Sequence, residues 1–253
     1  MGSQKRKKVG SFAAKKGALM IHPKDSWDRW AERHGDPLLS VHRSPDRTCL
    51  NPIVEDVIGK LSLQKRETLL DVGCGSGVLL SELVKKAEIV GTGIDFAEKQ
   101  IEIAKVHFPQ ISFQVGSVES IPFPDQSFDK VLCYGVLLYI EDWKPALHEL
   151  VRVCKTGGMI LLGDLPSIRH RSKLYWEYLK KVPKAIFRWN ILKNMFSYRE
   201  ATPWYWMDLE SMVHYIGSLG YQAEILRQPK GHRQYGGVTG NYRLDILIKK
   251  GTP

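Results

Sequence analysis

The chain has 253 residues, a formal net charge of +10 and 43% hydrophobic residues. This length suits one domain with a sizeable core, or one domain with a modest appendage. The longest uncharged apolar run covers residues 131–140, which is far shorter than the ~20 residues that a membrane-spanning helix needs. The four cysteines are scattered without a C-x-x-C pair, which argues against a disulfide framework or a zinc site and favours reduced thiols in a cytoplasmic protein.

The positive charge is concentrated in two segments. Residues 1–17 contain six basic residues and no acidic one, and residues 167–206 contain nine basic and two acidic residues, which leaves about −3 for the remainder. We expect residues 1–20 to form a disordered basic tail and residues 21–253 to form the folded domain. The tail suits contact with an anionic membrane surface or with nucleic acid, and its cluster Lys5 to Lys8 resembles a nuclear-import signal.

Hydrophobic periodicity predicts an alternation of strands and helices along most of the chain. Helices are predicted over residues 25–34, 52–62, 143–154 and 208–219, and strands near 67–72, 88–94, 111–115, 128–134, 158–164, 221–228 and 243–250. Further helices lie between the first five strands. Such an alternation builds a parallel sheet with right-handed crossovers, so the chain is predicted to be an α/β protein.

A glycine-rich turn follows the first predicted strand, where residues 69–79 read LLDVGCGSGVL. Alternating glycines let the backbone turn sharply and approach a ligand closely, and the turn aims the N–H groups of a new helix at that ligand. The third glycine comes one residue too early for the G-x-G-x-x-G pattern of nicotinamide or flavin sites. The alternative is an ordinary tight connection between a strand and a helix.

An acid, Asp95, ends the second predicted strand. A carboxylate at this position is placed to accept two hydrogen bonds from a ribose diol. Because Asp95 also precedes a helical segment, the alternative is that it caps that helix. The two roles are compatible.

Four segments resemble one enzyme family. The G-x-G-x-G order next to an acid resembles the first motif of class I S-adenosylmethionine (SAM) dependent methyltransferases. Residues 116–129, GSVESIPFPDQSFD, are similar to the G-D-A-x-x-L-P-F-x-D-x-S-F-D segment of the ubiquinone and menaquinone biosynthesis group (methyltransferase type 11). Residues 146–158, ALHELVRVCKTGG, resemble that group's A-L-x-E-x-x-R-V-L-K-P-G-G, and residues 25–34 its N-terminal segment that closes over the cofactor. Ser117 stands where the group has an Asp that contacts adenine.

The resemblance implies a Rossmann-like fold, with a seven-stranded, mostly parallel sheet, helices on both faces, an antiparallel last strand and a helical cap over residues 165–207. It implies SAM as cofactor and S-adenosylhomocysteine (SAH) as product. In the group, the glycine turn binds the methionyl end, the acid of the second strand binds ribose, and the third segment binds adenine. The cofactor contacts implied for this chain are Trp27, Trp30, Asp71, Gly73, Cys74, Gly75, Gly77, Asp95, Phe96, Ser117, Val118 and Tyr134.

Methyl transfer from a sulfonium is an in-line displacement, in which the protein mainly aligns the reacting atoms. A general base is needed only when the acceptor must lose a proton. The resemblance places His170, His232 and Tyr139 on the acceptor side, where they are the candidates for that role.

The predicted cap combines nine basic residues with ten aromatic residues. The rings either pack the cap onto the sheet edge or line an acceptor pocket for an apolar or ring-containing anion. We therefore expect methyl transfer to an O or N atom of a small-molecule or lipid-like acceptor, with negative charge. The alternatives are an RNA or protein methyltransferase anchored by its basic segments, and a SAM-binding protein without transferase activity. The sequence leaves the oligomeric state open.

Overall fold

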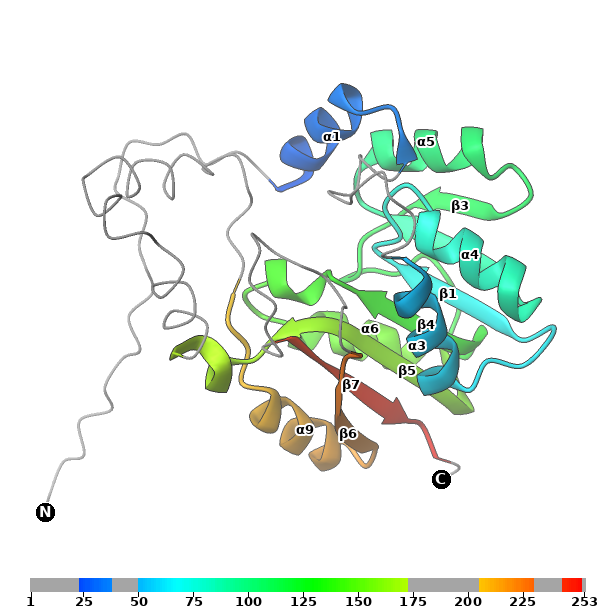
Figure 1. Cartoon of the computed structure of the whole chain (residues 1–253). Coiled ribbons are helices and arrows are strands. Elements are labelled where there is room, and N and C mark those ends of the chain that lie inside the picture. The colour runs from blue at the N-terminus through cyan, green and yellow to red at the C-terminus, as the bar shows by residue number, and fades with distance from the viewer. Residues whose placement is uncertain (1–22, 38–49, 173–204, 230–242, 252–253) are drawn as a thin grey trace, which may run out of the picture.

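The computed structural model describes residues 23–37, 50–172, 205–229 and 243–251 (Figure 1). The predicted tail, most of the predicted cap and His232 lie outside these ranges. The seven strands are β1 (Thr68–Val72), β2 (Val90–Asp95), β3 (Ser112–Val115), β4 (Phe128–Tyr134), β5 (Cys154–Pro166), β6 (Gln222–Arg227) and β7 (Arg243–Lys249). The α-helices are α1 (Pro23–Arg33), α3 (Asn51–Leu61), α4 (Val78–Ala87), α5 (Glu98–His107), α6 (Lys144–Val153) and α9 (Leu209–Ser218).

The strands form one twisted sheet in the order β3-β2-β1-β4-β5-β7-β6. The first five strands are parallel to one another, whereas β7 pairs antiparallel with both β5 and β6. This arrangement confirms the predicted Rossmann-like sheet with an antiparallel last strand.

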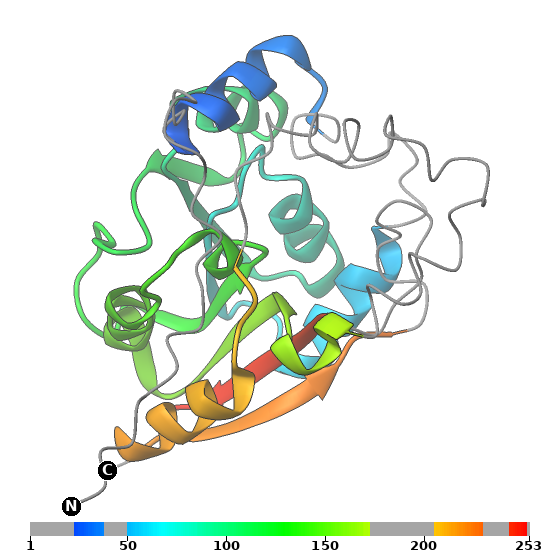
Figure 2. The same ribbon diagram turned by 90° about the vertical axis from the view of Figure 1, so that its left-hand side faces the viewer.

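Helices cover both faces of the sheet, as Figures 1 and 2 show. Helices α6 and α9 pack on one face, and α3, α4 and α5 pack on the other. Helix α1 lies beside α5 at the end of the sheet that carries β3. Within the described residues, none of the helices combines the length and the apolar character required to cross a bilayer.

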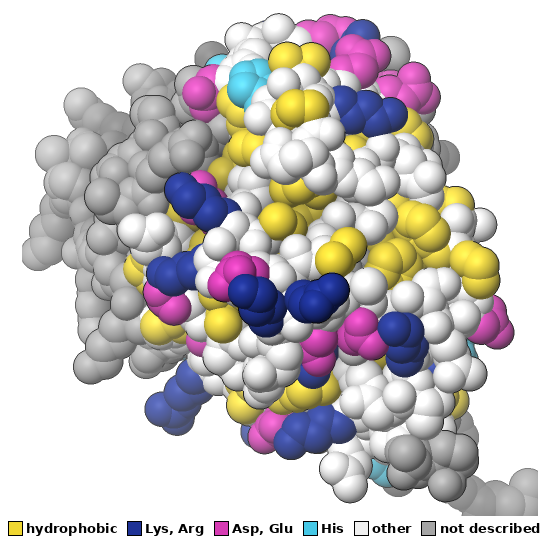
Figure 3. All heavy atoms as spheres, turned by 90° about the vertical axis from the view of Figure 1, so that its right-hand side faces the viewer, with side chains coloured by type: hydrophobic (Ala, Val, Ile, Leu, Met, Phe, Trp, Pro, Cys, Tyr) yellow, Lys and Arg dark blue, Asp and Glu magenta, His cyan; other side chains and the backbone are white. Residues whose placement is uncertain are grey.

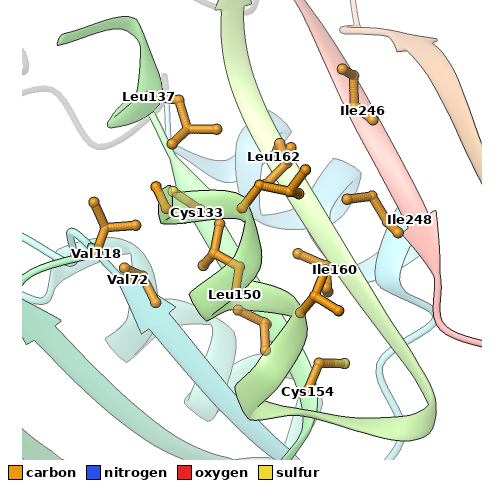
Figure 4. Packing of buried hydrophobic residues seen from close by; sticks show 14 of the residues in the cluster. Val72, Val118, Cys133, Leu137, Leu150, Cys154, Ile160, Leu162, Ile246 and Ile248 are labelled. Atoms are coloured by element: carbon orange, nitrogen blue, oxygen red, sulfur yellow. The ribbon is translucent and has the colours of Figure 1, made fainter. Parts of the chain in front are cut away.

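Helix α6 buries the apolar residues that recur at helical spacing along its sequence (Figure 4). Leu147 and Leu150 recur at helical spacing and are fully buried, together with Ile160 and Leu162 of β5. Burying each such side chain contributes about 1.5–3 kcal/mol. The helix ends at Val153, one residue before its predicted end, because the chain turns directly into β5.

The order of the strands locates the binding edge. The chain runs from β1 outward to β3 and then returns to place β4 on the other side of β1. In open α/β sheets, ligands bind beyond the carboxyl ends of the strands at such a reversal. The glycine turn, Asp95, Ser117 and Tyr134 all lie at or just beyond the carboxyl ends of β1 to β4.

On the face drawn in Figure 3, the described Lys and Arg side chains are interspersed with Asp and Glu.

Candidate functional site

The glycine turn after β1 has a backbone that side chains would disrupt. Gly73, Gly75 and Gly77 have φ values of 76°, 55° and 77°. A β-carbon at Gly73 would overlap the side chain of Val136, and one at Gly77 would lie 2.6 Å from the ring of Phe113. Gly77 provides no side-chain cap to α4, so the positive end of this helix faces the turn and favours a carboxylate there.

Asp95 connects the end of β2 to this turn. Its Oδ2 accepts a hydrogen bond from the N–H of Gly75 at 2.8 Å, and its Oδ1 accepts one from Ala97 at 2.9 Å. Burial raises the pKa of Asp95 to about 6, against the effect of these backbone hydrogen bonds. An ionised carboxylate can accept about four hydrogen bonds. The backbone N–H groups of Gly75, Phe96 and Ala97 use up to three of them, so acceptor capacity for about one hydrogen bond from a ribose diol remains.

The alternative role of Asp95 as a helix cap is wrong. The residue at the N-cap of α5 is Ala97, which provides no side-chain hydrogen bond. In its place, Asp28 of α1 accepts a hydrogen bond from the N–H of Lys99 at 3.0 Å. The charge of Asp28 also contributes to the raised pKa of Asp95. Helix α1 therefore supplies the carboxylate at the start of α5.

The segment after β3 continues the site. The N–H of Gly116 donates to the carbonyl of Asp95 at 3.0 Å. Ser117 is half-buried, and its Oγ accepts a hydrogen bond from the N–H of Glu119 at 3.2 Å. Val118 is buried in the core cluster, whereas Phe96, which follows Asp95, is half-buried. Thus the backbone of residues 116–118 lies next to the acid of β2.

Asp71 and Tyr134 lie at the ends of the two central strands. The buried Asp71 pairs in register with Gly93 of β2 and Leu132 of β4. Tyr134 ends β4, and its hydroxyl accepts a hydrogen bond from Gln228 Nε2 at 3.2 Å. Burial, together with the charges of Asp95 and Asp71, raises the pKa of the Cys74 thiol. This thiol therefore stays protonated near neutral pH and lines the turn without acting as a nucleophile.

Helix α1 and the residues after it are attached to the same edge. The ring of Trp27 meets that of Tyr139 edge to face, with centroids 5.8 Å apart. Trp30 stacks on His34 with centroids 4.3 Å apart. The Ser76 hydroxyl donates to the carbonyl of Pro37 at 2.6 Å. Residues 23–37 therefore reach both the glycine turn and the loop after β4.

Two of the three acceptor-side candidates, Tyr139 and His170, lie on two short 3₁₀ helices, η2 (Leu137–Tyr139) and η3 (Ile168–His170). The segment that ends the cap joins them, because the N–H of Tyr205 donates to Leu138 and the carbonyl of Met207 accepts from Ile168. The Nδ1 atom of His170 is buried and has no hydrogen-bond partner in the part of the chain that the structure describes. Tyr139 and His170 therefore flank the two ends of the cap insertion.

The sequence did not indicate a buried ionic network at the end of β5. Asp164 has a φ of 63°, and the Nη1 of Arg243 donates to its carbonyl at 2.9 Å and to its Oδ2 at 3.0 Å. The N–H of Asp164 donates to Asp245, which also accepts from Lys60 and Gln228. The only available signal was an acid at the end of a predicted strand.

Arg169, in the basic cap segment, forms an ion pair with Glu210 of α9 at 2.9 Å. Part of the positive charge of this segment is therefore neutralised within the fold. Within the described ranges, no group of three or more His, Cys, Asp and Glu side chains is placed to hold a metal ion.

A family model described as a methyltransferase domain matches residues 70–162, from β1 into β5. A demethylmenaquinone methyltransferase of Renibacterium salmoninarum is 28% identical over 182 residues, which cover 71% of this chain and 75% of that protein. Residues 70–162 form a methyltransferase domain, and the chain is a SAM-dependent methyltransferase.

Two further similarities place this methyltransferase among its relatives. An ajmaline N-methyltransferase of Rauvolfia serpentina is 32% identical over 138 residues, which cover 50% of this chain and 47% of that enzyme. The crystal structure of a SAM-dependent methyltransferase from Methanococcus maripaludis has the same fold, with a TM-score of 0.56 and 20% identity. The match covers 91% of this chain and 94% of that one.

The residues at the carboxyl edge fit the cofactor of the methyltransferase. The three glycines have positive φ and carry no β-carbon, so the backbone of the turn is open to a ligand at these positions. The Asp95 carboxylate retains acceptor capacity next to the turn. The turn would hold the methionyl end, Asp95 the ribose, and the backbone of Val118 the adenine. SAM would supply a methyl group on a positively charged sulfur, so that attack of the acceptor on the methyl carbon breaks the carbon–sulfur bond and releases SAH.

Proposed function

We propose that this methyltransferase transfers the methyl group to an oxygen or nitrogen atom of a small-molecule or lipid-like acceptor that carries negative charge. The observation that supports this proposal is the attachment of both ends of the cap insertion to the carboxyl edge. The sequence of residues 173–204, between these two ends, is rich in basic and aromatic residues. The hydrogen bonds of Tyr205 and Met207 hold one of these ends against η2 and η3.

The acceptor side has three candidate groups. The buried Nδ1 of His170 and the hydroxyl of Tyr139 belong to η3 and η2, and His232 lies outside the described residues. We assign proton removal to one of the two histidines, because an acceptor hydroxyl or ammonium must lose a proton during transfer. The names of two relatives, which refer to a quinone precursor and to an alkaloid, support a small-molecule acceptor.

A second candidate is an RNA or protein acceptor, favoured by the six basic residues within residues 1–17. Residues 133–136 read CYGV, not the N/D-P-P-Y/F of adenine-N6 and glutamine methyltransferases, which favours the small-molecule acceptor.

We propose that the enzyme is cytoplasmic and that its basic tail contacts an anionic membrane surface or nucleic acid. Nuclear import through the Lys5 to Lys8 cluster is the corresponding proposal for a eukaryotic host.

The deciding experiment incubates the purified enzyme with methyl-labelled SAM and an extract separated into lipid, RNA, protein and small-molecule fractions. Label in the small-molecule or lipid fraction supports the proposal, and label confined to RNA or protein overturns it. With the acceptor identified, its KM should rise with ionic strength while SAH affinity changes little, because salt screens charges beyond about 10 Å at 0.1 M.

Charge reversal tests the same proposal at the cap. Replacing both Arg169 and Arg171 by Glu should raise the KM for the acceptor at low salt. The matched control reverses Lys65 and Lys86, two exposed lysines paired with Glu88 and Glu55. If the KM for the acceptor changes neither with salt nor in the cap variants, the cap charges have a structural role instead of binding the acceptor.

A further inference from the structure

One ion pair on helix α6 is unusually rich in contacts. Glu149 and Arg152 face each other one turn apart, with Arg152 Nε 2.7 Å from Oε1 and Nη2 2.8 Å from Oε2. This two-point contact matches the planar guanidinium to the carboxylate and fixes both side chains. The hydrogen bond to Arg152 lowers the pKa of Glu149, so the pair stays ionised across the neutral range.

The remaining donors of Arg152 hold the segment that follows the proposed adenine turn. Nη1 donates to the carbonyl of Phe123 at 2.8 Å and to Asp125 Oδ1 at 2.9 Å, and Nη2 donates to the carbonyl of Ile121 at 3.0 Å. Glu149 Oε2 accepts the N–H of Ile121 at 2.8 Å. The pair therefore binds both backbone groups of Ile121, in addition to its neighbours.

These contacts fix one end of a short turn whose other end is already fixed. At the first end, the N–H of Gly116 donates to the carbonyl of Asp95 at 3.0 Å. At the second end, Ile121 is buried and held by the pair. Only residues 117–120 lie between, and this short span leaves them little freedom. A displacement of Ile121 would therefore move the backbone of Val118.

A backbone N–H that points at N1 of the bound base determines which purine can bind. The N1 atom of adenine is an acceptor, so it pairs with a backbone N–H, whereas the N1 of hypoxanthine carries a hydrogen and is repelled by it. A side chain can relax around the wrong base, but a turn fixed at both ends cannot. Discrimination against the wrong base therefore depends on how firmly the turn is held.

We propose that Glu149 and Arg152 are a positioning pair that sets the selectivity of the cofactor site for adenine. This inference rests on the proposed contact between adenine and the backbone of Val118. It also gives a physical reason why the segments at 116–129 and 146–158 occur together: side chains of the second hold the backbone of the first.

The test compares the binding of SAH with that of its deaminated analogue, S-inosylhomocysteine, by calorimetry. The wild-type enzyme should prefer SAH by more than about tenfold, the effect of one hydrogen bond gained against one repulsion. In Arg152→Met, we expect the affinity for SAH to fall about tenfold and the affinity for S-inosylhomocysteine to fall less. The preference for SAH over the analogue should therefore narrow to about threefold or below. General destabilisation would weaken both ligands equally and leave the ratio unchanged.

Lys155→Met is the matched control. Lys155 lies in the same segment and also forms an ion pair, 2.7 Å from Asp129 Oδ1. Asp129 lies at the amino end of β4, at the opposite edge of the sheet from the adenine turn. Its removal should leave the ratio of affinities at the wild-type value. Arg152→Lys and Glu149→Gln, which keep the volume of the side chains, should narrow the preference in the same direction as Arg152→Met, and they carry the test if Arg152→Met does not fold.

The outcomes separate the two proposals. A wild-type enzyme that binds both ligands equally would refute the contact between adenine and Val118. A selective wild-type enzyme whose ratio is unchanged in the folded Arg152 and Glu149 variants would overturn the positioning pair and leave that contact standing.

Discussion

The carboxylate of Asp95 and the backbone N–H of Gly75 are joined by a hydrogen bond of 2.8 Å. This bond ties the acid at the end of β2 to the middle of the glycine turn after β1. The two parts of the proposed cofactor site, for ribose and for the methionyl end, are therefore coupled before any ligand binds. A change at Asp95 should affect both.

Replacing Asp95 by Ala removes the proposed ribose contact and the support of Gly75. SAH affinity should fall about ten- to a hundredfold, corresponding to roughly 1.5–3 kcal/mol. Calorimetry at pH 7.5 measures this change. Asp129→Ala is the control, because that acid bonds to Thr68 at the amino end of β1 and belongs to no proposed cofactor contact. Equal affinities in the wild type and Asp95→Ala would refute the ribose assignment.

Cofactor binding should weaken as the pH falls through about 6, since burial raises the pKa of Asp95 to that value and protonation removes acceptor capacity. The contribution of Asp95 to the stability of the fold depends on pH in the opposite direction, being larger at low pH. Its folded pKa lies above the ordinary 3.8, so this contribution is fully present below that value and is lost as the pH rises through 6. SAH titrations from pH 5 to 8 measure the first effect.

The same titration in Asp28→Asn should have its midpoint at a lower pH. The negative charge of Asp28 contributes to the raised pKa of Asp95, and Asn can still accept the hydrogen bond from Lys99. Asp25→Asn, on the same helix and exposed, should leave the midpoint in place. An identical midpoint in wild type and Asp28→Asn would show that the two carboxylates are not electrostatically coupled.

Two truncations should separate the tail from the helix that follows it. Removing residues 1–17, which lack apolar periodicity, should change neither SAH affinity nor the melting temperature. Removing residues 1–37 also removes the contacts of Trp27, Asp28 and Pro37, and SAH should then dissociate faster. Stopped-flow release and thermal melts measure both. A large drop in melting temperature after the shorter truncation would make the tail part of the fold.

The ion pair between Asp164 and Arg243 is buried on both sides. Asp164→Asn tolerates the φ of 63° but leaves a buried guanidinium without this carboxylate, which should cost about 3–5 kcal/mol. Arg243→Met should cost a similar amount for the converse reason. The double variant should lose less than the sum of the two, as urea unfolding would reveal. Strictly additive losses would mean that the pair is not coupled.

The sequence predicted what depends on local pattern. Strand ends, the glycine turn and the acid at Asp95 follow from hydrophobic runs and backbone requirements within a few residues. The side chains that hold the site together were not predicted, because their partners are far apart in the chain: Ser76 binds Pro37 39 residues away, Lys99 binds Asp28 71 residues away, and Arg243 binds Asp164 79 residues away. Periodicity indicates which face of an element is buried, but not which distant carbonyl or carboxylate a polar side chain will meet.

The position of β7 has a consequence for how the protein is made. This strand is the last of the seven along the chain, yet it lies between β5 and β6. During synthesis, β5 and β6 leave the ribosome before the strand that joins them, so each waits with an open edge. Exposed strand edges promote aggregation, and the edge of β5 waits longest: β5 ends at Pro166 and β7 begins at Arg243, whereas β1 ends at Val72 and β4 begins at Phe128. Shielding of the β5 edge during translation should therefore influence the yield of folded enzyme more than shielding of β1.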